Sequence, residues 1–255
     1  MKLPENRFKR ALREGRQQIG LWCSLPGSYV AEAVAASGFD WLLFDTEHSP
    51  NDVLSVLPLL QAVAPYDVSP VVRPASNDTV LIKRILDLGA QTLLVPYVQN
   101  ADEARSAVRA MRYPPEGIRG VSGLTRATRF GRVEGYAKRA ASELCLLVQI
   151  ETGEAVEQIE AIAAVDGVDG IFVGPADLAA SLGFAGEQGN PKVVATIEGA
   201  IRQIRASGKP AGILTPDNAF ATRCMTLGTT FTAVGIDAGI LARGTEKLAQ
   251  QFRAS

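Results

Sequence analysis

Short apolar runs rich in strand-forming residues alternate with amphipathic segments along most of the chain. This alternation predicts parallel strands joined by crossover helices, because each parallel connection is long enough to hold a helix. Eight such units can be counted. The predicted strands are GLWCSL from Gly20, FDWLLFD from Phe39, SPVVRP from Ser69, QTLLVPYV from Gln91, LCLLVQIE from Leu144, VDGIFVG from Val168, PAGILTP from Pro210 and TTFTAVGI from Thr229.

Eight equal units predict closure into a (β/α)₈ TIM barrel, an α/β fold, rather than an open sheet. The length of 255 residues, with 47% hydrophobic residues, suits one such domain over residues 1–255. The closest alternative is a doubly wound sheet, which usually has fewer strands and a glycine-rich first turn. No G-x-G-x-x-G sequence follows the first predicted strand, so the barrel is favoured.

One stretch departs from the alternation, namely YPPEGIRGVSGLTRATRFGRVEG from Tyr113 to Gly135. Its glycines, prolines and arginines predict a long ordered loop. Long ordered loops in compact domains are usually functional. An oligomer contact or a solvated surface loop is an equally good interpretation, and both stay open at this point.

Composition and charge exclude several classes of partner. The net charge is −1 and the 26 basic residues are scattered, so nothing attracts nucleic acid or an anionic membrane. The N-terminus is polar, and no apolar run reaches the ~20 residues of a membrane span. We therefore expect a soluble, cytoplasmic protein. Cys23, Cys145 and Cys224 form no C-x-x-C pair and are interpreted as reduced, buried residues.

Candidate chemistry lies where the predicted strands end, because the active site of a (β/α)₈ barrel sits at the carboxyl ends of its strands. The polar and small residues at those positions are Trp22, the run Asp45-Thr46-Glu47-His48, Arg73, Gln149, Glu151 and the run Gly174-Pro175-Ala176-Asp177.

Glu151 and Asp177 follow neighbouring strands without sulfur or imidazole beside them. Two carboxylates with open coordination positions predict Mg²⁺ or Mn²⁺ holding a small chelating acid, whereas Zn²⁺ prefers more nitrogen or sulfur ligands. The alternative is that Glu151 begins a helix and Asp177 caps the next one.

His48 is the only histidine and lies just past a strand end, where its near-neutral pKa suits proton abstraction next to a carbonyl. Asp45 could orient the ring or stabilise the turn. Arg73 could stabilise a developing enolate, or form a structural ion pair at the barrel rim. None of the seven lysines falls at the carboxyl end of a predicted strand, so a Schiff-base mechanism is disfavoured and a metal must polarise the carbonyl.

At these residues the chain resembles the HpcH/HpaI aldolase family, which shares a barrel of the phosphoenolpyruvate/pyruvate type. The motifs that carry the resemblance are GFDWLLFDTEH, PVVRP, LLVPYVQNADEA, YPPEGIRGV, LVQIET and VDGIFVGPADL. The resemblance implies a class II aldolase that joins pyruvate or hydroxypyruvate to an aldehyde. Mg²⁺ or Mn²⁺ would be the metal, with Co²⁺ or Zn²⁺ as further candidates.

The same resemblance implies roles for individual residues. Glu151 and Asp177 would bind the metal, His48 would be the base, and Arg73 would stabilise the enolate. Asp87 would raise the basicity of the histidine, supplied by a neighbouring subunit because its predicted helix ends at the opposite face of the barrel. The residues expected to contact the oxo acid are Gln149, Gly174, Pro175 and Ala176, and those expected on the aldehyde side are Trp22 and Leu214.

The resemblance also implies a homo-oligomer, typically a hexamer with exchanged C-terminal helices, which makes AGILARGTEKLAQQF an interface helix. Two alternatives remain. A coenzyme A ester lyase of the malyl-CoA or citryl-CoA type would share the barrel and the metal but is expected to carry an extra C-terminal lid. A non-catalytic barrel that binds an organic acid would be expected to lack one of the rim residues.

Overall fold

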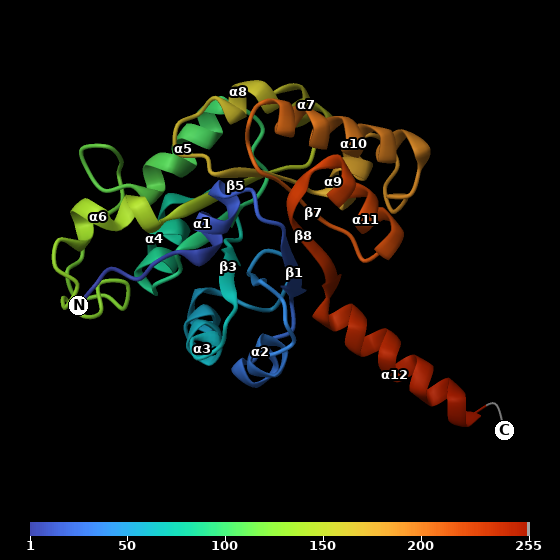
Figure 1. Ribbon diagram of the computed structural model, residues 1–255, viewed down its shortest axis with the longest axis horizontal. Coiled ribbons are helices and arrows are strands. Elements are labelled where there is room, and N and C mark those ends of the chain that lie inside the picture. Colours follow the sequence, from blue (N-terminus) through green and yellow to red (C-terminus); the bar gives the residue numbers. More distant parts are fainter. Residues whose placement is uncertain (254–255) are drawn as a thin grey trace.

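Eight parallel strands close into a barrel in which each strand pairs with the next along the chain and the last pairs with the first. The computed structural model describes residues 1–253 (Figure 1). The strands are β1 (Gln18–Cys23), β2 (Trp41–Asp45), β3 (Ser69–Arg73), β4 (Thr92–Val95), β5 (Cys145–Ile150), β6 (Gly170–Val173), β7 (Ala211–Leu214) and β8 (Thr229–Ile236). All eight predicted strands are confirmed, and so is the closed barrel.

Helices surround the barrel. Their apolar faces pack against the outer side of the sheet, where they share one hydrophobic core with the strands. They are α1 (Arg7–Arg13), α2 (Ser28–Ala35), α3 (Val53–Val63), α4 (Thr79–Asp87), α5 (Ala101–Met111), α6 (Tyr136–Glu143), α7 (Gly153–Glu157), α8 (Ile159–Ala163), α9 (Pro175–Ser181), α10 (Pro191–Ala206), α11 (Asn218–Leu227) and α12 (Asp237–Arg253). Among residues 1–253, no helix combines the length and the apolarity that crossing a membrane requires.

The inside of the barrel is filled by large aromatic side chains. Trp41 and Phe231 are almost fully buried there, with ring centroids 6.4 Å apart. Two glycines make room for these rings, since a Cβ on Gly20 would lie 2.1 Å from the Trp41 ring and one on Gly212 would lie 2.1 Å from the Phe231 ring. The barrel is therefore a packed core and not a channel.

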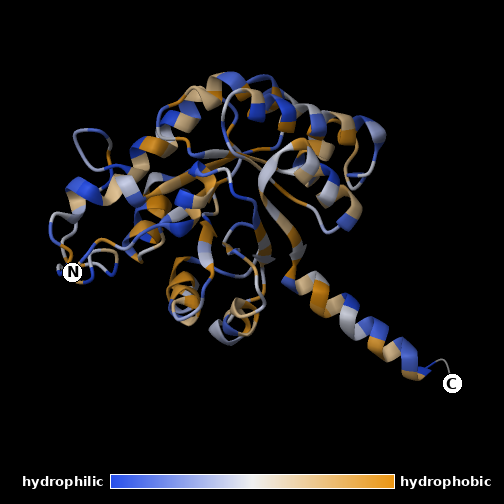
Figure 2. Ribbon diagram, viewed as in Figure 1, coloured by the Kyte–Doolittle hydropathy of each residue, from blue (hydrophilic) through white to orange (hydrophobic). Residues whose placement is uncertain are grey.

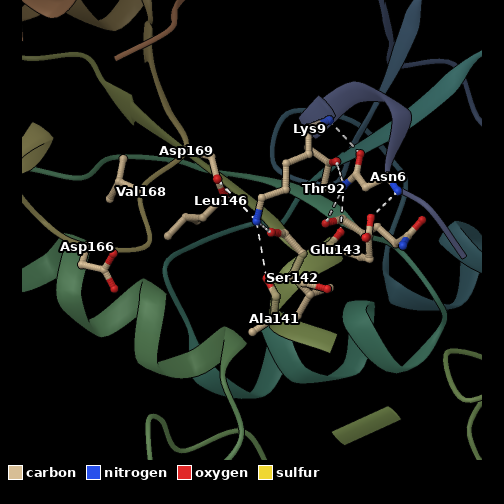
Figure 3. A network of polar contacts seen from close by, with 12 residues as sticks. Asn6, Lys9, Thr92, Ala141, Ser142, Glu143, Leu146, Asp166, Val168 and Asp169 are labelled. Carbon is tan, nitrogen blue, oxygen red and sulfur yellow. Dashed lines mark hydrogen bonds and ion pairs between the residues drawn. The ribbon is translucent and has the colours of Figure 1, made fainter. Parts of the chain in front are cut away.

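The amino end of the barrel is closed by α1. Phe8 of this helix is completely buried and makes edge contacts with the rings of Trp41 (5.9 Å) and Phe231 (6.0 Å). Next to it, Lys9 is also buried, donating from Nζ to the Leu144 carbonyl and lying 3.4 Å from Asp169 (Figure 3). Lys9 is thus a buried lysine at the end of the barrel opposite to the predicted site, where it cannot form a Schiff base with a substrate at the mouth.

The stretch 113–135 forms a loop of turns that packs at the same closed end. Arg119 donates to Asp87 at the end of α4 (2.7 Å), and Arg126 donates to the Leu88 carbonyl (2.7 Å). Four apolar residues of this loop are exposed, namely Ile118 (46%), Val121 (70%), Leu124 (77%) and Phe130 (61%). Within one chain the loop therefore lies far from the mouth, and its exposed apolar residues favour the interpretation as a contact surface.

Helix α12 follows β8, and its start contacts the strands β1 and β8. It extends away from the other helices, and Figure 2 shows hydrophobic residues along its length. Ile240, Leu241 and Leu248 are each more than half exposed, and Asp237 is the buried residue of this helix. The Asp237 carboxylate accepts hydrogen bonds from the backbone amides of Ser24 (2.9 Å) and Leu25 (3.1 Å), which fixes the start of α12.

Candidate active site

A buried ion pair lies at the carboxyl ends of β2 and β3, where Asp45 and Arg73 are register partners. Arg73 donates from Nε to one carboxylate oxygen of Asp45 (2.8 Å) and from Nη2 to the other (2.6 Å). Trp22 completes the cluster, because its Nε1 donates to Asp45 (3.2 Å) and its ring lies 4.7 Å from the guanidinium carbon. This two-point pairing fixes the plane of the guanidinium.

Asp45 is fully committed to this cluster. Burial alone would raise its pKa, but the hydrogen bonds and charge of Arg73 outweigh burial and hold the pKa below its usual range. Each carboxylate oxygen of Asp45 accepts two hydrogen bonds, one oxygen from Arg73 and the backbone amide of Glu47, the other from Arg73 and Trp22. The structure places Asp45 against Arg73, not in the position of a carboxylate that orients the histidine.

Glu47 and His48 continue the chain beyond β2. His48 has a largely exposed side chain (64%), and its Nε2 lies 3.8 Å from Glu47 Oε2. The same oxygen of Glu47 lies 2.7 Å from Nη1 of Arg73. Burial raises the pKa of Glu47. The charges of Arg73 and His48 lower it, and those of Asp45 and Asp177 raise it further. His48, Glu47 and Arg73 therefore stand side by side at the mouth.

The sequence predicts no role for Glu47, although its carboxylate lies between Arg73 and His48, for which roles are predicted. The signal that could have revealed it is its place directly after a buried strand, one residue before the only histidine.

Glu151 follows β5 and is buried (2% exposed). Its carboxylate accepts hydrogen bonds from Gln149 Nε2 (2.6 Å) and from the backbone amide of Tyr97 (2.8 Å), whose left-handed φ of 54° is part of that turn. Burial is the main reason why its pKa rises to about 7, and the nearby carboxylates of Asp177 and Glu47 contribute. The next helix is capped by Thr152, so Glu151 does not serve as the helix cap.

Asp177 lies in the first turn of α9, directly after β6, with its side chain exposed. It is close enough to Glu151 and Glu47 to raise the pKa of both. Gly174 provides space between the two strands: a Cβ there would lie 2.7 Å from Glu151 Oε2 and 3.0 Å from Gln149 Nε2. A carboxylate is also favourable at the start of a helix, so Asp177 fits that role as well.

The donor atoms at this mouth fit a hard divalent cation. They are carboxylate and amide oxygens, and Gln149 Oε1 and Glu47 Oε2 are buried without an aligned hydrogen-bond donor in the described chain. In residues 1–253, no three His, Cys, Asp or Glu side chains lie close enough to hold an ion alone. The site would thus offer two carboxylates, Glu151 and Asp177, and leave positions open for a substrate.

An apolar pocket of about 680 Å³ adjoins the loop after β6. Pro175, Ala176 and Leu214 line it together with Phe220 and Ile236. Leu214 therefore borders open space next to the predicted acid-binding residues. Trp22, which was also expected on the aldehyde side, lies in the cluster with Asp45 and is 5% exposed.

Asp87 lies at the other end of the barrel. It closes α4 and pairs with the completely buried Arg119, whose guanidinium also lies 4.6 Å from the Tyr113 ring centroid. Helices of the barrel run opposite to the strands, so the end of α4 is at the closed face. Within one chain, Asp87 is not brought to His48.

Comparisons with known proteins extend this picture. Residues 18–243 match the family model described as HpcH/HpaI aldolase/citrate lyase. The chain is 70% identical to a pyruvate aldolase from Rhizobium etli, over 99% of both chains. It is 58% identical to a 4-hydroxy-2-oxo-heptane-1,7-dioate aldolase from Salmonella heidelberg, over 98% of this chain and 95% of that one.

Solved structures agree in fold. A HpcH/HpaI aldolase/citrate lyase family protein from Burkholderia cenocepacia superposes with a TM-score of 0.94 at 39% identity, over 97% of this chain and 99% of that one. A citrate lyase beta subunit complexed with oxaloacetate and magnesium, from M. tuberculosis, shares the fold at 19% identity and a TM-score of 0.55, over 89% and 93% of the two chains. With the barrel and its mouth as described, this chain belongs to the HpcH/HpaI aldolase/citrate lyase family.

Proposed function

We propose that this protein is a class II pyruvate aldolase, a carbon–carbon lyase that makes and cleaves 4-hydroxy-2-oxo acids with the help of a divalent cation. The aldolase activity is supported by relatives at 58–70% identity over nearly the whole chain. The observation that best supports a metal site is the buried Glu151 carboxylate, whose pKa rises to about 7 because of burial and of the nearby Asp177 and Glu47. Such a group gains most from a cation that neutralises it.

Glu151 and Asp177 would hold the cation, preferably Mg²⁺ or Mn²⁺, because they offer oxygen and no nitrogen or sulfur. The magnesium named for the citrate lyase beta subunit of the same fold is consistent with this choice. When bound, a divalent cation polarises the keto oxygen of the acid and makes the protons on its C3 more acidic. Gln149 and the turn from Gly174 to Ala176 would orient the acid.

His48 would remove a proton from C3 of the oxo acid. Arg73 would stabilise the enolate, because a fixed guanidinium interacts more strongly with the enolate oxygen than with a neutral ketone. The enolate carbon then attacks the aldehyde, which enters on the side of Leu214, and cleavage follows the same path in reverse. Pyruvate and hydroxypyruvate both fit this chemistry, since each has protons on C3.

The oligomer is part of the same proposal. One barrel domain would span residues 1–255, and α12 would pack on a neighbouring copy, because Ile240, Leu241 and Leu248 are each more than half exposed. Hexamers of exchanged pairs would bring Asp87 of one subunit toward His48 of another. The exposed apolar residues of the loop 113–135 would contribute to these contacts.

Deuterium exchange at C3 of pyruvate tests the chemistry without an aldehyde. We expect exchange in the presence of Mg²⁺ or Mn²⁺ and none in EDTA, as followed by nuclear magnetic resonance. The variant His48→Asn should lower the exchange rate about 100-fold or more, while its fold is unchanged because the side chain is exposed. Exchange that persists in EDTA would remove the metal from the proposal. A panel of aldehydes with pyruvate and hydroxypyruvate then defines the substrates.

A further inference from the structure

One oxygen of Glu47 lies between two residues of the proposed mechanism. Oε2 is 2.7 Å from Arg73 Nη1 and 3.8 Å from His48 Nε2. The Glu47 side chain is only 18% exposed, whereas that of His48 is 64% exposed. Glu47 is therefore the more enclosed residue of the pair, and its carboxylate lies on the inner side of His48.

Arg73 binds its two acidic neighbours through different nitrogens. Nε and Nη2 are used by Asp45, so Nη1 is the nitrogen directed at Glu47. Asp45 fixes the orientation of the guanidinium through two hydrogen bonds, and a second anion at Nη1 offsets its charge from the open side of the mouth. Loss of Glu47 would leave Nη1 facing the mouth without an anion.

Glu47 Oε2 has remaining capacity to accept a hydrogen bond. It is buried, and no donor of residues 1–253 meets it with good hydrogen-bond geometry, although Arg73 lies within ion-pair distance. A buried acceptor without an aligned donor is costly unless a ligand or water completes it. The carboxyl groups of Glu151 and Asp177, which interact with Glu47 at the same mouth, cannot donate a hydrogen bond when they are ionised.

The charges at this mouth are unbalanced. The ionisable groups that interact there are the carboxylates of Asp45, Glu47, Glu151 and Asp177, the guanidinium of Arg73 and the exposed imidazole of His48. When all four carboxyl groups are ionised, they outweigh the one permanent positive charge and leave an excess of negative charge. A divalent cation offsets much of it, and each carboxylate nearby adds to the attraction for that cation.

We propose that Glu47 is a positioning residue of the reaction, which holds the Nη1 side of Arg73 next to His48 and supplies a third negative charge that strengthens binding of the divalent cation at Glu151 and Asp177. This inference rests on the proposed function. Glu47 acts through Arg73 and through the field at the mouth, and it does not replace either of the two carboxylates that hold the ion.

The first measurement is Mn²⁺ binding by calorimetry, without substrate, at pH 8. Glu47→Gln keeps the size of the side chain and removes its charge, so we expect a Kd about tenfold higher than that of the unaltered protein. Glu154→Gln is the matched control, because it removes one exposed carboxylate from the first turn of α7 near the same end of the barrel. Its Kd should stay within about twofold.

The second measurement separates the effect of the Glu47 charge from the effect of its side-chain length. Glu47→Asp keeps the negative charge on a shorter side chain, so its Mn²⁺ affinity should stay within about threefold of normal. Its carboxylate no longer reaches Arg73 Nη1, and kcat for pyruvate exchange should fall at least tenfold at saturating Mn²⁺. Thermal unfolding of all variants shows that each is folded.

Unchanged Mn²⁺ affinity in Glu47→Gln, or an equal loss in Glu154→Gln, would overturn the role of the charge. Full exchange activity in Glu47→Asp would overturn the contact with Arg73. Failure of the proposed function looks different: the unaltered protein would then bind Mn²⁺ but catalyse no exchange, and the comparison of affinities would still decide the role of the Glu47 charge.

Discussion

Arg73 donates hydrogen bonds to both carboxylate oxygens of Asp45, from Nε at 2.8 Å and from Nη2 at 2.6 Å. Both residues, and Trp22 beside them, are no more than 5% exposed. The two residues are register partners at the ends of adjacent strands, so the barrel itself sets their separation. The pair gives the mouth a guanidinium whose orientation does not depend on a substrate.

Breaking this pair should affect stability and catalysis together. Arg73→Ala leaves a buried carboxylate unpaired, which should cost about 3–5 kcal/mol in the free energy of unfolding, and it should lower turnover about 100-fold. The double variant Asp45→Ala with Arg73→Ala should recover part of the stability but none of the activity. Urea unfolding and pyruvate exchange measure the two effects. Equal stability in the single and double variants would contradict the pairing.

The raised pKa of Glu151 predicts how stability depends on pH. The pKa rises from 4.5 to about 7 on folding, so the folded protein holds a proton that the unfolded chain releases. The stabilisation is complete below pH 4.5 and is lost as the pH rises through 7. In EDTA, the midpoint temperature of thermal unfolding should therefore decrease as the pH is raised from 5 to 8. Glu151→Gln, which cannot ionise, should show a smaller fall over the same range.

The same group predicts proton release when a cation binds. A cation needs the ionised carboxylate, and at pH 6 only about a tenth of a group with a pKa of about 7 is ionised. Mn²⁺ affinity should thus be about tenfold weaker at pH 6 than at pH 8. Calorimetry in buffers of different ionisation enthalpy counts the released protons. Affinity that is flat across this range would show that Glu151 does not bind the ion.

Gly174 should be intolerant of any side chain. A Cβ at this position would lie 2.7 Å from Glu151 Oε2, so Gly174→Ala must displace the carboxylate. Overpacking of this kind costs about 1–3 kcal/mol, so the protein should remain folded. We expect Mn²⁺ affinity to fall at least tenfold. Gly189→Ala is a suitable control, because a Cβ there meets nothing within 4 Å.

The exposed face of α12 predicts that the oligomer depends on it. Leu241→Asp with Leu248→Asp places charges on a helix face that is more than half exposed in one chain. The barrel of each chain should stay folded, while light scattering coupled to gel filtration should show a smaller assembly. Lys247→Asp, on the same helix, serves as a polar control. An unchanged mass in the double variant would rule out this helix as the interface.

The barrel and the general location of the site could be predicted from sequence because both follow local rules. Apolar runs mark strands, and the end of a strand marks the mouth, so the sequence alone places Asp45, Arg73 and Glu151 at that end of the barrel. Their partners could not be predicted in the same way. Which oxygen faces which nitrogen depends on register and side-chain rotamer. For that reason the sequence left two roles open for Asp45, and its pairing with Arg73 was not predicted.

The contacts of Glu47 could not be predicted from sequence because Arg73 and Asp177, which interact with it, lie far from it along the chain. The burial of Lys9 had a similar cause. This residue reads as part of a polar terminal helix, and only the closure of the barrel above α1 shows that its Nζ is enclosed by Leu144 and Asp169.

Closure of the barrel base by Phe8 leaves the mouth as the route for both substrates. A molecule that binds deepest must then arrive first and depart last. If the oxo acid lies on Glu151 and Asp177 while the aldehyde waits beside Leu214, condensation should follow an ordered kinetic scheme. In cleavage, the aldehyde is then the first product to leave, and pyruvate should inhibit competitively against the hydroxy-oxo acid.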